Sequence, residues 1–195
     1  GDTGLLIPGA SWSRTWGRGF IFVLDGLRFD LSLRAADEGF GSDVSFGQVY
    51  SSLKFITSVG GRNRLIARGS VGSTTTSEFE ELPASVRFFT GGSQSVRGYK
   101  FQSLGPEDES GDVIGGRRLL TGSIEFEHAL NDRWGIALFF DIGNAVEEFD
   151  DDLEQGAGFG VRWKSPVGPV RIDLASAISL DDQPWRLHIN IGPDL

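Results

Sequence analysis

The sequence predicts an all-β chain that crosses a membrane as part of an antiparallel β-barrel. Three observations lead to this fold class. Apolar and polar residues alternate with a period of two in one segment after another. Gly and aromatic residues are abundant (28 Gly, 15 Phe and 5 Trp against 7 Pro), as is typical of strands and turns. Connections between the segments alternate in length, as they do in outer-membrane barrels.

The alternation indicates about nine strands, each long enough to cross a bilayer at a tilt. The segment 27–34 shows the pattern clearly, since its even positions are polar or small and its odd positions are Leu or Phe. The segment at about 4–15 is the least regular. We expect strands at about 4–15, 27–34, 46–59, 62–74, 119–130, 134–143, 157–164, 170–175 and 185–191.

One face of these strands is apolar, and the other carries charges of both signs. The polar face includes Arg162, Lys164, Arg171 and Arg186 together with Glu125, Asp141 and Asp173, as expected for a wet, ion-paired lumen. A soluble β-sandwich also alternates, with its polar face in water, so this alternative stays open on the pattern alone. In a barrel, the residues expected to face lipid include Leu120, Ile124, Phe126, Leu138, Phe140, Val161, Trp163, Leu174 and Leu187.

The lengths of the connections favour the barrel. Short links are expected at about 60–61, 131–133 and 166–168, and longer ones at 36–45, 75–118, 146–155 and 179–184. Short and long links alternate strictly after residue 36, which matches short periplasmic turns and long external loops. The acidic run 146–152 in one long link is expected to be a solvated loop, with a divalent-cation site as the alternative.

Composition excludes several function classes. The chain has no Cys, which removes disulfides and thiolate chemistry, and its net charge of −9 argues against a nucleic-acid binder. His128 and His188 have no metal-type or triad-type partner at a usable spacing, and no GxSxG elbow is present. We therefore expect no enzyme activity, catalytic residue, metal or cofactor. The chain also has no Met, so we expect a processed product or a fragment.

The longest connection, at about 75–118, contains a motif that indicates the protein family more specifically than the alternation of polar and apolar residues does. Gly91-Gly92-Ser93-Gln94-Ser95 precedes Val96, Arg97, Gly98 and Tyr99. This string resembles the lid-loop motif of the superfamily that includes BamA, TamA and the two-partner secretion transporters. The wider segment 88–106 is similar to TamA-type proteins in particular, as is the ending Ile191-Gly192-Pro193-Asp194-Leu195. Segments 123–127, 140–145 and 160–171 resemble later strands of the same barrel.

The resemblance implies a place in a larger barrel. Family barrels have about sixteen strands, and the order of segments fits strands eight to sixteen. Residues 1–195 would then be the C-terminal part of the barrel domain, and a lid loop at about 75–118 would fold into the lumen. The first seven strands and the periplasmic POTRA domains would precede it.

Arg97 suits a loop that must be fastened inside a lumen. Its planar guanidinium can bind two carboxylates with directed hydrogen bonds. Glu125 and Asp141 lie on the polar faces of adjacent predicted strands, and the family pattern assigns them as partners of Arg97. Gly98 permits a tight turn, and the ring of Tyr99 can pack on the wall.

The function implied by the resemblance is assembly of proteins into the bacterial outer membrane. The barrel would open laterally beside its last strand, here Trp185, Leu187, Ile189 and Ile191, whose unpaired edge could template an incoming strand. Implied partners are outer-membrane lipid, nascent outer-membrane and autotransporter proteins, and a TamB-like protein that spans the periplasm.

Other functions remain as alternatives. A BamA-like core subunit or a two-partner secretion transporter would differ in the number and order of POTRA domains. A passive porin-like barrel would conduct ions across a bilayer. A soluble β-sandwich would stay in solution without detergent.

Overall fold

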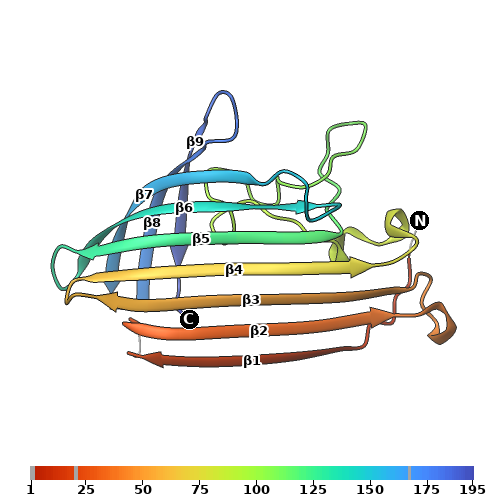
Figure 1. The fold of residues 1–195 in the computed structure, drawn as a ribbon, viewed down its shortest axis with the longest axis horizontal. Coiled ribbons are helices and arrows are strands. Elements are labelled where there is room, and N and C mark those ends of the chain that lie inside the picture. The colour runs from red at the N-terminus through yellow and green to blue at the C-terminus, as the bar shows by residue number, and fades with distance from the viewer. Residues whose placement is uncertain (1–2, 20–21, 167) are drawn as a thin grey trace.

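The structure is a computed structural model that describes residues 3–19, 22–166 and 168–195. Within these residues, nine strands form one antiparallel sheet in which every strand pairs with its neighbours in the chain (Figure 1). The strands are β1 (Gly9–Arg18), β2 (Asp25–Ala36), β3 (Phe46–Val59), β4 (Asn63–Thr75), β5 (Arg118–Ala129), β6 (Trp134–Val146), β7 (Glu154–Ser165), β8 (Gly168–Ala177) and β9 (Trp185–Ile191). The only helices in these residues are three single 3-10 turns: η1 (Glu38–Phe40), η2 (Phe79–Glu81) and η3 (Ala84–Val86). The predicted all-β, antiparallel fold is confirmed.

The two faces of the sheet follow the alternation of the sequence. Leu138 in β6 is 64% exposed, whereas its neighbour Ala137 is 2% exposed on the opposite face. The exposed residues on the outer face are large and apolar, a surface that is stable against lipid but not against water. Among the residues predicted to face lipid, Ile124, Phe126, Leu138, Phe140, Val161, Trp163 and Leu187 are exposed, and Leu120 and Leu174 are half-buried.

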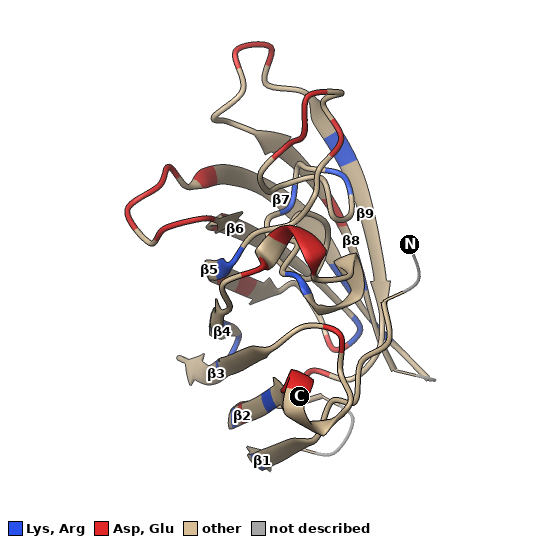
Figure 2. Cartoon of the chain, turned by 90° about the vertical axis from the view of Figure 1, so that its right-hand side faces the viewer, with Lys and Arg blue, Asp and Glu red and all other residues tan. Residues whose placement is uncertain are grey.

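The sheet curves around a polar interior. Figure 2 looks toward the long loops and shows the strands arranged in an arc, with β8 and β9 standing across from β1 to β3. In the described residues β1 pairs only with β2, and β9 pairs only with β8. A sheet that crosses a bilayer must satisfy its edge N–H and C=O groups. The fold is therefore a section of barrel wall with two edges that require partners.

The first strand begins later than the alternation suggested. It was expected at about 4–15, whereas β1 begins at Gly9. Residues 3–8 instead run beside the β2–β3 connection, where the backbone N–H of Gly4 donates to Asp43 at 2.6 Å and that of Leu6 donates to Ser42 Oγ at 3.0 Å. Pro8 has no N–H to give to a ladder, which favours a start of the strand after it.

The connections have the predicted alternation in length. Because neighbouring strands are antiparallel, the short links 60–62 and 130–133 and the short β7–β8 link fall at one end of the strands. The long links 37–45, 76–117, 147–153 and 178–184 fall at the other end. Val167, in the predicted link 166–168, lies outside the described residues. No described segment forms a helix long and apolar enough to cross a membrane.

Candidate functional site

The site is built where the β4–β5 loop, residues 76–117, enters the concave side of the sheet. Gly91 and Gly92 both have positive φ angles, and the N–H of Gly92 donates to the carbonyl of Val96 at 3.1 Å. This tight turn presents Val96 and Arg97 to the wall. Val96 is fully buried in an apolar cluster with Tyr99, Leu104 and Ala177 of β8. The glycine turn before Val96 and the apolar cluster around Val96 and Tyr99 therefore both hold the motif in place.

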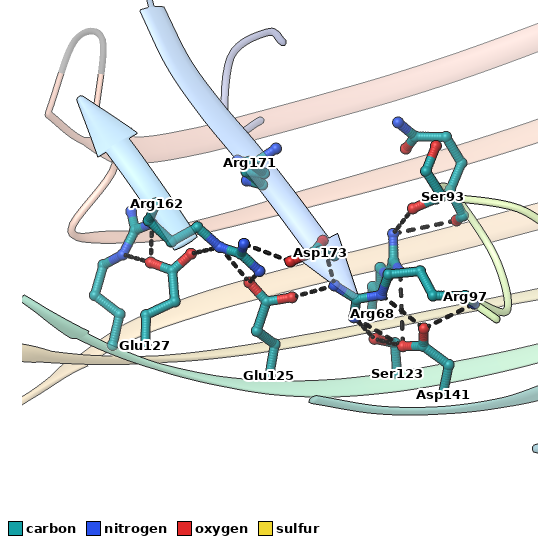
Figure 3. A network of polar contacts seen from close by, with 12 residues as sticks. Arg68, Ser93, Arg97, Ser123, Glu125, Glu127, Asp141, Arg162, Arg171 and Asp173 are labelled. Atoms are coloured by element: carbon teal, nitrogen blue, oxygen red, sulfur yellow. Dashed lines mark hydrogen bonds and ion pairs between the residues drawn. The ribbon is translucent and has the colours of Figure 1, made fainter. Parts of the chain in front are cut away.

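Arg97 lies at the centre of a set of carboxylates from three strands (Figure 3). Its Nε and Nη2 donate to the two oxygens of Asp141 at 2.7 and 2.9 Å, which is the bidentate geometry that guanidinium favours. Its Nη1 donates to Glu125 at 2.7 Å and to Asp173 at 3.1 Å. The guanidinium carbon also lies 3.4 Å from the ring centroid of Phe139. The structure thus brings Arg97 together with both carboxylates that the sequence assigned to it.

The ionic contacts of Arg97 continue along the inner face. Arg162 of β7 binds Glu125, Glu127 and Asp173, and Arg64 of β4 binds Glu127. Within the described residues the network joins Arg64, Arg68, Arg97, Arg162 and Arg171 to Glu125, Glu127, Asp141, Asp173 and Asp194. Equal numbers of the two charges allow burial, because each ion has a partner of opposite sign. Loss of a single member leaves a buried charge uncompensated.

Burial and ion pairing act in opposite directions on Arg97. Burial lowers the pKa of its guanidinium, but the hydrogen bonds and charge of Asp141 outweigh this, and the net pKa lies above its ordinary value. The residue is therefore a permanent cation. It can hold the loop in position and neutralise carboxylates, but it does not act as an acid or base at physiological pH.

Gly98 and Tyr99 make the loop fit against the wall. Gly98 has a φ of +98°, and a Cβ there would lie 2.7 Å from the backbone N of Ala177. The hydroxyl of Tyr99 donates to Glu154 of β7. Burial, and then the hydrogen bond to Glu154, raise the pKa of the Tyr99 phenol above its ordinary value. Both residues fasten the loop to β7 and β8.

Glycines in β7 leave room for this arrangement. A Cβ at Gly156 would lie 2.0 Å from the carbonyl oxygen of Arg97, and one at Gly160 would lie 1.9 Å from a carboxylate oxygen of Asp173. Any larger residue at Gly156 would displace the loop backbone itself. The glycine-rich stretch of β7 is therefore a seat for the loop and its partners.

The segment after β9 forms a second ionic contact with the wall. Asp194 is fully buried, and its carboxylate accepts from Arg64 Nη1 at 2.8 Å, from the N–H of Val23 at 3.1 Å and from Arg171. Burial raises the pKa of Asp194, but the charges of Arg64 and Arg171 outweigh it and the net pKa is lowered. Leu195 packs beside Val23, Ile56 and Ile66.

The predicted gate strand has one paired and one unpaired edge in the described chain. Its predicted residues Trp185, Leu187, Ile189 and Ile191 are all exposed on the outer face of β9. On the opposite face, Arg186 and His188 point inward and contact the backbone of Gly98. The sequence reasoning did not assign Arg186, His188, Asp173, Phe139 or Asp194 to the site. Alternation had already placed Arg186 and Asp173 on the polar face, but it did not identify their partners.

The acidic run 146–152 forms a turn. The backbone N–H groups of Glu147 and Glu148 both donate to Asp151 Oδ2 at 3.0 Å. Among the described residues, no group of three His, Cys, Asp or Glu side chains is placed to hold a metal ion. Nothing in this geometry favours the cation site over a solvated loop.

An apolar outer face, an ionic inner face and long loops at one end define the wall of an outer-membrane β-barrel. The family model described as "Omp85 superfamily domain" matches residues 19–194, and the chain belongs to this superfamily. It is accordingly a protein of the bacterial outer membrane.

Two relatives are similar to this chain. The outer membrane protein assembly factor BamA of Nitratidesulfovibrio vulgaris (strain Hildenborough) is 37% identical over 110 residues, which cover 52% of this chain and 14% of that protein. The crystal structure of BamA from Haemophilus ducreyi lacking POTRA domains 1–3 superposes with a TM-score of 0.76 at 20% identity, over 95% of this chain and 42% of that one. The chain therefore spans a minor part of each relative.

Proposed function

We propose that this chain forms part of a barrel that assembles other proteins into the bacterial outer membrane. The β4–β5 loop acts in it as a lid held inside the lumen, and β9 acts as the strand beside which the barrel opens. The observation that carries the proposal is the combination of a loop held by buried ion pairs with a last strand that is short and, in the described residues, paired on one edge only.

The contrast between strands supports β9 as the mobile element. β9 has seven residues, whereas each of the other strands has ten or more. It pairs with β8 through seven residue pairs, and β3 pairs with β4 through thirteen. A short strand with few ladder bonds separates at lower cost than a long one, and its freed N–H and C=O groups can pair with an incoming strand.

An assembly assay tests the proposal. The full-length protein is reconstituted into liposomes, an outer-membrane barrel protein is added from urea, and its folding into the bilayer is followed by gel mobility. We expect faster folding than in protein-free liposomes, and a smaller acceleration when Arg97 is replaced by Ala. Equal rates in liposomes with and without the protein would contradict the function.

Within this class, we propose a TamA-type protein. The segment 88–106 and the ending Ile191-Gly192-Pro193-Asp194-Leu195 support this assignment, although the two relatives above are BamA proteins. A TamA-type protein would work with a TamB-like partner and with autotransporter clients. Affinity purification of the full-length protein from its own membranes tests the partner, and recovery of a BamA-type complex instead would overturn the finer assignment.

The competing function is that of a porin-like channel, because a porin would have the same apolar outer face. The Arg97 network and the apolar cluster around Val96 argue against it, because both fill the interior that a porin keeps open. Planar-bilayer recordings distinguish the two. An assembly factor with its loop seated would conduct little and irregularly, whereas a porin would give large, steady openings.

A further inference from the structure

Gly98 uses both of its backbone polar groups to bind β9. Its N–H donates to Nε2 of His188 at 3.0 Å, and its carbonyl accepts from Nε of Arg186 at 3.3 Å. His188 and Arg186 stand two residues apart on the inner face of β9, so the strand holds the loop backbone from one side. His188 is 9% exposed, so its ring has little contact with the solvent.

The same glycine is pressed against β8. A Cβ at Gly98 would lie 2.7 Å from the backbone N of Ala177 and from the backbone carbon of Ser176. Only a glycine allows the loop backbone to approach this closely with a positive φ. The close approach is what brings the N–H and C=O of Gly98 within reach of β9.

The contact with β9 is joined directly to the Arg97 network. Arg97, one residue earlier in the chain, binds Asp141 of β6 and Asp173 of β8. Asp173 lies directly opposite His188 in the β8–β9 register. Two successive residues of the loop therefore connect the firmly paired strands with the short strand β9.

We propose that His188 is a positioning residue that fastens β9 to the β4–β5 loop, so that release of the loop and release of the strand are coupled. Its ring accepts the Gly98 N–H at Nε2, which requires that nitrogen to be unprotonated. Arg186 supports the same contact by donating from Nε to the carbonyl oxygen of Gly98. The role of β9 as a gate rests on the proposed function, whereas the coupling itself rests only on these contacts. In an assembly factor, this coupling keeps the gate closed until a client or a partner displaces the loop.

Hydrogen exchange of the full-length protein in lipid nanodiscs tests the coupling without an assembly assay. His188→Phe keeps a ring of similar size but removes the acceptor, and His188→Gln restores an acceptor oxygen near the position of Nε2. Loss of one buried hydrogen bond should accelerate exchange in the peptide around 96–100 by about tenfold. We expect this acceleration in His188→Phe and exchange close to the unchanged protein in His188→Gln.

A matched control comes from the other histidine of the chain. His128 lies in β5, and its Nδ1 is 2.7 Å from Oδ1 of Asn63 in β4. His128→Phe should leave exchange in the loop unchanged. If His128→Phe accelerates it as much as His188→Phe, or if His188→Gln behaves like His188→Phe, the histidine acts through general packing and the proposal fails.

The reciprocal measurement covers the case in which His188→Phe does not fold. Asp141→Asn weakens the bidentate seat of Arg97 without touching β9. If loop and strand are coupled, exchange in the β9 peptide 185–191 rises in this variant. Unchanged exchange in that peptide overturns the coupling. A coupled protein that fails to accelerate client folding would instead contradict only the proposed assembly function.

Discussion

At the scale of single residues, the site depends on the shape of arginine as much as on its charge. Arg97 contacts three carboxylates and an aromatic ring at once, and only a planar group with five donors can do so. The neighbouring glycines are equally specific. Gly98 and Gly156 each occupy a place where a Cβ would collide with backbone atoms.

Replacement of Arg97 by Lys separates these two contributions. Lys keeps the positive charge but cannot form the bidentate hydrogen bonds to Asp141 while also reaching Glu125 and Asp173. We expect Arg97→Lys to destabilise the full-length protein by about 1–3 kcal/mol and Arg97→Ala by about 3–5 kcal/mol. Urea midpoints measured in detergent check this order. Arg97→Lys with the stability of the unchanged protein would show that charge alone holds the loop.

The sequence predicted part of this residue-scale picture. The motif identified Arg97, and alternation placed Glu125 and Asp141 on the inner face of adjacent strands. The contributions of Asp173 and Phe139 could not be predicted, because they depend on where the loop lies along the wall and on the register between β6, β7 and β8. Asp194 was missed for another reason. It follows β9, where the period-two pattern has ended and no longer indicates a direction.

At the scale of elements, alternation was enough to define strands and faces but not their ends. The strands from β2 to β9 lie where the pattern predicted them, and several extend by one to three residues into the expected links. The start of β1 was wrong, because residues 3–8 are tied to Asp43 and Ser42 in a distant loop. Contacts between segments far apart in the chain leave no periodic signal in either one.

Adjacent residues in β3 provide a matched test of the two faces. Leu53 is 46% exposed on the outer face, whereas Ser52 faces inward with its hydroxyl beside Asp30. Leu53→Arg places a charge against lipid near the middle of a strand and should cost about 2–4 kcal/mol. Ser52→Arg gains a nearby carboxylate and should cost clearly less. Folding titrations into lipid vesicles measure both, and equal costs would contradict the assigned lipid face.

At the scale of the whole molecule, the described strands form one curved sheet whose two edge strands, β1 and β9, each pair on one side only. The long loops gather acidic residues at one end (Figure 2), while Arg97 and Arg162 pair with carboxylates inside. The described strands leave β1 and β9 without partners on their outer edges. Because unpaired backbone is costly in lipid, we expect this chain alone not to form a stable closed monomer. A discrete, heat-resistant monomer in light scattering would contradict that expectation.

The central claim is that the β4–β5 loop is seated inside the barrel in the native membrane, and thiol labelling in intact cells tests it directly. The chain has no Cys, so single cysteines can be introduced at chosen sites. Val96 is fully buried against the wall, and Phe101 of the same loop is 78% exposed. With a membrane-impermeant maleimide, the account predicts labelling of Phe101→Cys, protection of Val96→Cys, and loss of that protection when Arg97→Ala is added. Equal labelling of Val96→Cys and Phe101→Cys in the otherwise unchanged protein would contradict it.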